Sequence, residues 1–145
     1  MAGKGQTLQQ TFLKYVFGAT TPATMSTTTL WVALHTADPG NSGDQTTNEV
    51  TYTNYGRVAT GNSTATGGWV FSGTFSPCSV FPTSAIIFPI CSTASAVVIT
   101  NWSVGATSGT GGSSNMYYTG TVTPNISLGA SVIPSLTTGT ACTED

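Results

Sequence analysis

The feature that most constrains this chain is a run of 86 residues, from Val58 to Thr143, that contains no Asp, Glu, Lys or Arg. The run is rich in Thr, Ser, Gly and Asn between aromatic and β-branched residues, a composition typical of β-strands joined by hydroxyl-rich loops. Charged residues make up 6% of the whole chain, against about a quarter in a typical soluble domain. A surface so close to neutral favours association with copies of itself or with other proteins.

The shortage of charge also argues against several classes of function. Three Lys and Arg residues cannot neutralise a phosphate track, so no nucleic-acid partner is expected. No apolar stretch reaches the length of a membrane span, so no membrane partner is expected either. Cys78, Cys91 and Cys142 lack the CxxC spacing of a zinc site and are interpreted as small, buried or semi-buried thiols. No phosphate-binding glycine loop occurs, and no cofactor is predicted.

One helix is predicted near the N-terminus, over residues 7–17. Thr7 and Gln10 have the spacing of a capping box, and Gly18 supplies a stop. Apolar residues recur along one face between these signals: Leu8, Phe12, Leu13, Val16 and Phe17. A helix of about three turns is too short to be stable alone, so this face is predicted to pack on a sheet. Residues 1–5 are predicted to form a flexible arm.

The rest of the chain has the pattern of short β-strands separated by Gly, Pro and Asn turns, with turns predicted at Phe81-Pro82 and Thr123-Pro124-Asn125 among others. Strands are predicted over residues 30–36, 50–52, 55–60, 69–74, 85–88, 96–104, 115–122 and 130–133. The segment 30–36 is apolar on both faces, which predicts a central strand covered on both sides. A chain of 145 residues is expected to form one domain. The pattern predicts a mainly β fold: a single-domain, jelly-roll-like β-sandwich over residues 1–145, with a short N-terminal α-helix.

His35 is the only histidine and the first candidate for catalysis. A Ser-His-Asp arrangement would need a serine and a carboxylate beside it, and serines are abundant here. No G-x-S-x-G motif occurs, and His35 lies within the strongest predicted strand rather than in a loop. We therefore interpret His35 as a packed or hydrogen-bonded strand residue, and we expect the chain not to be an enzyme.

The loop 38–49 is the one segment that resembles a metal site. Asp38 and Glu49 stand at the first and twelfth positions of a calcium-binding loop, with a glycine at the sixth. The third position is Gly40, which has no side-chain oxygen, and no predicted helices flank the loop. A turn with an anchoring carboxylate is favoured over calcium binding, and no metal is predicted.

Three charged residues are candidates for a structural pair or for partner contacts. Arg57, the last charge before the uncharged run, is placed to pair with Glu49 across a hairpin. A pair within the chain is favoured, and a pair between subunits is the alternative. Lys4 lies in the predicted arm, which is the candidate segment for reaching a neighbouring molecule.

An aromatic cluster at Met116, Tyr117 and Tyr118, together with the three tryptophans, allows two interpretations. These side chains could anchor an interface or form a carbohydrate-binding platform. Aromatic residues in a β-sandwich more often belong to the core or to cross-strand pairs, and this interpretation is favoured.

The order of several blocks resembles a family of small virion proteins of tailed bacteriophages. The blocks are the amphipathic start Leu8–Gly18, the segment LWVALHTADPG at 30–40, NEV at 48–50, YGRV at 55–58, AIIFP at 85–89, MYYTG at 116–120, VTP at 122–124, LG at 128–129 and TE at 143–144. The resemblance covers nearly the whole chain. Such proteins are often labelled tail-fibre proteins, and the resemblance also suits capsid decoration (cement) proteins.

This resemblance implies a structural protein of the virion. The leading hypothesis is a capsid decoration protein that binds the outer face of the head and bridges capsid subunits. Its expected partners are the major capsid protein and copies of itself, as a homotrimer. The alternative is a tail or tail-fibre component that takes part in binding a host receptor or glycan. The expected location is the capsid surface, after synthesis in the host cytoplasm.

Overall fold

The protein is mainly β with one short helix, as the sequence predicts. The computed structural model describes residues 3–18, 29–63, 66–72, 78–93, 96–109 and 116–144. Its largest sheet has five antiparallel strands, which are in spatial order β1 (Gly3–Lys4), β8 (Met116–Ser127), β7 (Val98–Gly105), β2 (Thr29–His35) and β3 (Val58–Gly61). A second sheet has three strands, in the order β10 (Cys142–Glu144), β5 (Cys78–Pro82) and β4 (Trp69–Ser72).

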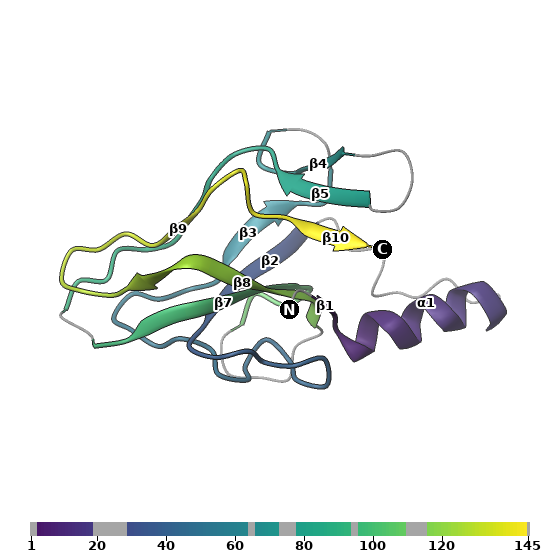
Figure 1. Ribbon diagram of the computed structural model, residues 1–145, viewed down its shortest axis with the longest axis horizontal. Coiled ribbons are helices and arrows are strands. Elements are labelled where there is room, and N and C mark those ends of the chain that lie inside the picture. The colour runs from purple at the N-terminus through teal and green to yellow at the C-terminus, as the bar shows by residue number, and fades with distance from the viewer. Residues whose placement is uncertain are drawn as a thin grey trace.

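Two further elements complete the arrangement. A two-stranded antiparallel ribbon joins β6 (Ile86–Ile87) to β9 (Ser135–Leu136). The helix α1 (Gln6–Gly18) extends from one end of the molecule, whereas β9 lies toward the other end (Figure 1). The β-elements pack against one another in a β-sandwich-like domain, which agrees with the predicted fold class.

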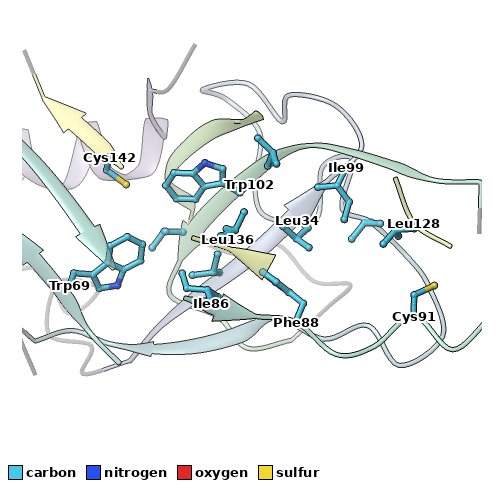
Figure 2. Packing of buried hydrophobic residues seen from close by; sticks show 14 residues of the cluster. Leu34, Trp69, Ile86, Phe88, Cys91, Ile99, Trp102, Leu128, Leu136 and Cys142 are labelled. Atoms are coloured by element: carbon cyan, nitrogen blue, oxygen red, sulfur yellow. The ribbon is translucent and has the colours of Figure 1, made fainter. Parts of the chain in front are cut away.

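One hydrophobic core lies between the sheets and the ribbon. The five-stranded sheet contributes Val32, Leu34, Ile99, Trp102, Val104 and Val122; the ribbon side contributes Ile86, Phe88, Cys91, Leu128 and Leu136; the three-stranded sheet contributes Trp69 and Cys142; the covering segment 36–57 contributes Val50. Figure 2 shows side chains from all three sheets gathered in this one layer. Because inward positions alternate along each strand, apolar residues occupy every second position of β2. In β7, Trp102 and Val104 follow the same alternation, and Ile99 joins the core on the other side of a register shift between Ile99 and Asn101.

The strand β2 is central and buried on both faces, as its apolar pattern predicts. It lies between β7 and β3 in the sheet, and residues 32–35 are all 0% exposed. Val32 and Leu34 face the core, as does Val50, whose N–H donates to the carbonyl oxygen of Leu34 at 2.9 Å. Ala33 and His35 face the opposite side of the sheet, which most of the segment 36–57 covers. The polar layer described below lies under that cover.

The N-terminus departs from the prediction of a flexible arm over residues 1–5. Residues 1–2 lie outside the described residues, but Gly3 and Lys4 form β1 and pair with Thr119 and Tyr118 of β8. Gly5 follows in close contact with the sheet: a Cβ at this position would lie 2.2 Å from the carbonyl oxygen of Met116. Only glycine allows so close an approach of two backbones, so this part of the arm is anchored to the sheet edge.

The helix begins one residue earlier than predicted. The carbonyl oxygen of Gly5 accepts hydrogen bonds from the backbone N–H groups of Leu8, at 3.1 Å, and Gln9, at 3.2 Å. Position 7 is therefore inside the first turn and not at the cap, and the side chain of Thr7 lies outside the described residues. Pairing of β1 with β8 fixes the preceding residues and so determines where the helix starts.

Several strand boundaries differ from the prediction, for identifiable reasons. Residues 50–52 form no strand, because the chain turns directly after them. The N–H of Tyr55 donates to the carbonyl oxygen of Tyr52 at 2.9 Å, and Asn54 lies inside this turn at φ 75°. Residues 130–133 likewise form a turn, with Ser131 at φ 66°, and only position 132 makes a bridge, to Cys91. Residues 73–74 of the predicted strand 69–74 lie outside the described residues, as does residue 115.

Two prolines lie in strands, although the sequence pattern predicts a turn at each. Pro82 is the last residue of β5, opposite Trp69. Pro124 lies inside β8, where the pairing shifts from Asn101↔Thr121 to Ile99↔Ile126. Residues 122–125 therefore oppose only Thr100, and a proline is tolerated there because no ladder hydrogen bond is required of its nitrogen.

Candidate functional site

A buried ion pair lies beneath the segment that covers β2. The guanidinium of Arg57 donates from Nε to Glu49 Oε1 at 2.7 Å and from Nη2 to Glu49 Oε2 at 2.8 Å. The side chain of Arg57 is 0% exposed and that of Glu49 is 7% exposed. The two parallel hydrogen bonds fix both the distance and the plane of the pair. The pair lies within the chain, which is the arrangement favoured from the sequence.

Neutral groups make further hydrogen bonds to both members of this pair. Arg57 Nη1 donates to the carbonyl oxygen of Thr107 at 2.9 Å, and the hydroxyl of Tyr55 donates to Glu49 Oε1 at 3.0 Å. The same hydroxyl accepts a bond from Leu34 N–H at 3.1 Å. Burial raises the pKa of Tyr55 far above its ordinary value. Buried charges without such partners are strongly destabilising, so this network holds the segment 49–57 against β2.

His35 extends the polar layer toward β7. Its Nδ1 lies 2.9 Å from the carbonyl oxygen of Thr47, which can only accept, so Nδ1 carries the proton. The other ring nitrogen, Nε2, accepts from the hydroxyl of Ser103 at 2.7 Å. Gln45 completes the layer by donating from Nε2 to the carbonyl oxygen of Trp31 at 2.9 Å. Burial lowers the pKa of His35 below 6.5.

The geometry around His35 differs from that of a catalytic triad. The group on Nδ1 is a backbone carbonyl rather than a carboxylate. Both His35 and Ser103 are 0% exposed, so a substrate cannot reach the serine hydroxyl. The neutral imidazole instead connects the loop at Thr47 to the strand at Ser103.

The carboxylates of the loop 38–49 are occupied by local hydrogen bonds. Asp38 accepts from Gly40 N–H at 2.9 Å, and Asp44 accepts from the N–H groups of Thr46, at 2.8 Å, and Thr47, at 3.2 Å. Burial acts against the charge of Asp44, but a hydrogen bond from the Thr46 hydroxyl together with these backbone bonds outweighs it and lowers the pKa of the carboxyl. Among the described residues, no group of three or more His, Cys, Asp or Glu side chains is placed to hold a metal ion.

The other candidate residues lie at the β1–β8 edge, away from the ion pair. Lys4 is the register partner of Tyr118. Met116 and Tyr117 are buried, at 1% and 8% exposure, and burial raises the pKa of Tyr117. Trp69 and Trp102 are buried as well. The side chains of these four residues therefore belong to the interior, as the favoured interpretation predicts, whereas Tyr118 and Trp31 are partly buried.

One exposed apolar surface of the described residues lies on α1, where the sequence predicts packing on a sheet. That prediction is wrong for residues 12–17, all of which are exposed. We call the apolar residues of this segment the helix face: Phe12, Leu13, Tyr15, Val16 and Phe17. The helix contacts the sheet at β8, and Leu8 and Thr11, in its first half, are partly buried.

The second surface lies on the ribbon, and we call Ile87, Ile90 and Ile133 the isoleucine patch. Their exposures are 61%, 41% and 54%. The pairing shifts by one residue between Ile87↔Ser135 and Cys91↔Val132. Two residues, Pro89 and Ile90, therefore lie opposite the single residue Ile133, as in a β-bulge. Pro89 and Ile90 are both exposed to solvent.

Sequence reasoning missed these two surfaces and the neutral half of the polar layer. The helix face was assigned to the interior because amphipathic helices usually cover a core. For the ribbon, the sequence does contain a signal of an exposed apolar residue. Ile86 and Ile87 are consecutive, so their side chains point to opposite faces of a short strand and one of them is expected to face solvent. Gln45 and Ser103 carry no charge and lie far from Arg57 in sequence, so no local pattern marks them.

These features define a small, mainly β structural domain whose residues 58–143 carry no fixed charge. The chain belongs to the Gp80 family of phage virion proteins, described as podophage GP4 fiber I protein gp80, and the family model matches residues 3–141. This match confirms the resemblance to small phage virion proteins and makes the chain a phage structural protein. No curated protein matches the chain. None of its described helices has the length and apolar character needed to cross a membrane.

Proposed function

We propose that this chain is a capsid decoration protein without catalytic activity. It binds the outer face of the phage head and stabilises the head by bridging neighbouring subunits of the major capsid protein. The observation that carries this proposal is the isoleucine patch, an exposed apolar surface within the uncharged run. A contact made there depends on apolar burial and on backbone groups. Repetition over the symmetric copies of a shell converts such modest contacts into firm attachment.

The compact shape of the domain supports a role on a surface. Its strands and ribbon enclose one hydrophobic core, as expected of a small unit that sits on a surface. The isoleucine patch lies on the ribbon, and α1 extends from the other end of the molecule (Figure 1). The ribbon end is therefore accessible to a shell without interference from the helix.

A second candidate function is that of a tail or tail-fibre component that helps bind a host receptor or glycan. The description of the family, which names a fibre protein, favours it. In this role the exposed aromatic rings would stack on sugar rings. Those rings are Phe12, Tyr15, Phe17 and Phe71, and they replace the tryptophans considered from the sequence.

Imaging of intact virions separates the two functions. Cryo-electron microscopy, with gold-labelled antibodies against this chain, is expected to show regularly spaced density and label on the head. Label confined to the tail would refute capsid decoration and support the second candidate.

A variant of the isoleucine patch tests the surface itself. Heads that lack this protein are incubated with the wild-type chain or with the double variant Ile87→Ser/Ile133→Ser, and occupancy is measured after sedimentation. We expect the double variant to lose at least about tenfold in affinity, because each serine removes a buried apolar side chain. Val70→Ser is the matched control, since Val70 is 45% exposed on β4 and outside the patch. Equal binding by the double variant would exclude the patch as the contact.

A further inference from the structure

One edge of the five-stranded sheet is β3, which in the described part of the chain pairs with β2 alone. In an antiparallel pair, the backbone groups of successive residues point alternately toward the partner strand and away from it. On β2, the backbone of Leu34 points away from β7, because its N–H donates to the Tyr55 hydroxyl at 3.1 Å and its carbonyl oxygen accepts from Val50 N–H at 2.9 Å. The even-numbered residues of β2 therefore bond β3, where their register partners are Thr60 and Val58.

This alternation leaves Ala59 with its N–H and its carbonyl oxygen directed out of the sheet. Gly61, two residues further along β3, follows the same pattern, since its N–H donates to the carbonyl oxygen of Gly67 at 2.8 Å rather than to β2. Ala59 is exposed, and no group among the described residues bonds its outward N–H or carbonyl oxygen. One backbone donor and one backbone acceptor are thus available to another molecule.

A small pocket lies beside this edge. It is lined by residues 58–60 of β3, by residues 67–68 and by residues of the segment 82–87, and its volume is about 80 Å³. This volume is well below the roughly 300–1,000 Å³ of a pocket for a drug-sized ligand, and it has room for one small side chain. All the lining residues belong to the uncharged run, so a charged side chain would find no ionic partner there.

The pocket continues into the isoleucine patch. The strand β6 contacts β3, and Ile87 of the patch lines the pocket. Because Phe88 N–H donates to the carbonyl oxygen of Pro134 at 2.9 Å, the backbone groups of the preceding Ile87 point away from β9. The outward backbone of Ala59, the pocket and the isoleucine patch therefore form one uncharged surface.

We propose that the β3 edge binds an extended, uncharged segment of another virion protein. The segment adds to the sheet as an antiparallel strand: its N–H donates to the carbonyl oxygen of Ala59, its carbonyl oxygen accepts from Ala59 N–H, and a small aliphatic side chain enters the pocket. An antiparallel strand fits because a single one of its residues satisfies both groups. The inference goes beyond the proposed function, since it holds for a segment carried by the head or by the tail.

A proline at position 59 tests the inference in whole virions. Ala59→Pro removes the outward N–H and leaves the bonds of Val58 and Thr60 to β2 intact, and an edge strand tolerates a proline whose nitrogen faces outward. Ala59→Val is the matched control, because it keeps the N–H and favours a strand. Phage that encode each variant are purified by sedimentation, and the amount of this chain per virion is measured. We expect at least about tenfold less of the proline variant and a wild-type amount of the valine control.

Hydrogen–deuterium exchange of the wild-type protein provides a second measurement that needs no variant. The amide of Ala59 is compared in intact virions and in the purified chain, and we expect its exchange to slow at least about tenfold in the virion. This measurement decides if urea unfolding shows that the proline variant does not fold. Equal exchange in the two states, or a folded proline variant retained at the wild-type amount, would overturn the inference.

The mass of the purified chain in solution distinguishes a partner from a second copy. If Ala59→Pro changes this mass and Ala59→Val does not, the edge belongs to a contact between copies and the inference fails. Retention of the proline variant would leave capsid decoration through the isoleucine patch untouched, whereas label confined to the tail would refute only capsid decoration. The two proposals therefore fail separately.

Discussion

Trp102 and Gly120 are register partners on β7 and β8, and the indole of Trp102 fills the space that a side chain at position 120 would occupy. A Cβ at position 120 would lie 2.8 Å from the indole Nε1 and 2.9 Å from Cε2. The close contact places the largest core side chain of β7 flat against the neighbouring strand. Glycine at position 120 is thus required by the packing of Trp102.

Replacing Gly120 with alanine should destabilise the fold by about 1–3 kcal/mol, because the added methyl group forces the indole out of its position. Urea unfolding followed by tryptophan fluorescence measures this loss. Gly129→Ala is the control, since a Cβ there meets only Val132 Cγ2, at 3.7 Å. Equal stability of the Gly120→Ala and wild-type chains would show that the core repacks freely around Trp102.

Removal of one partner of the buried ion pair should cost more than removal of both. Arg57→Met leaves Glu49 buried without its cation, and we expect a loss of about 3–5 kcal/mol in the free energy of unfolding. The double variant Glu49→Met/Arg57→Met should lose clearly less, since no unpaired charge remains. A double-mutant cycle by urea denaturation measures the difference. Strictly additive losses would contradict the coupling that the two short hydrogen bonds imply.

The stability of the fold should fall as the pH drops below about 6.5. Burial makes the pKa of His35 lower in the folded than in the unfolded chain. A group of this kind contributes its full stability above the unfolded pKa and loses it as the pH falls toward the folded pKa. We expect a slope of up to about 1.4 kcal/mol per pH unit in this window.

Because His35 is the only histidine, His35→Gln should remove this slope, although its stability at pH 7 will be lower. Urea midpoints and slopes at pH 7.5, 6.5 and 5.5 provide the comparison. A slope that is the same in the variant and the wild type would assign the titration to another group.

The three thiols should differ in reactivity. Cys91 and Cys142 are 0% and 7% exposed, whereas Cys78 is partly exposed. In a titration with a thiol reagent we expect one rapid equivalent from the native chain and three in denaturant. Cys78→Ser should abolish the rapid equivalent. If Cys91 or Cys142 were modified first, the core at that position would have to open more readily than its burial implies.

The fold class and the most apolar elements could be predicted from the sequence because their patterns are local. The strand predicted at 30–36 is found at 29–35, and the helix predicted at 7–17 is found at 6–18. Both depend on apolar residues whose period identifies the element directly. Pro82 and Pro124 misled the strand prediction, since their acceptability depends on a strand end and a register shift that only the paired sheet reveals.

The candidate sites were predicted less completely, for a similar reason. Glu49 and Arg57 are close in sequence and opposite in charge, so their pairing could be anticipated. The exposure of Phe12 and Phe17 could not, because an amphipathic period does not reveal whether the surface that covers it belongs to the same chain or to another. The isoleucine patch depends on a bulge in a ribbon whose two strands are far apart in sequence.

The absence of charge from the helix face has a practical consequence for handling the protein. Contacts driven by release of water from apolar surface weaken on cooling, and added sodium chloride has no ion pair to screen across such a contact. Any contact that buries the helix face should therefore weaken in the cold and change little with salt. A preparation of this chain should be kept near 0 °C where association is to be avoided, because added salt will not prevent it.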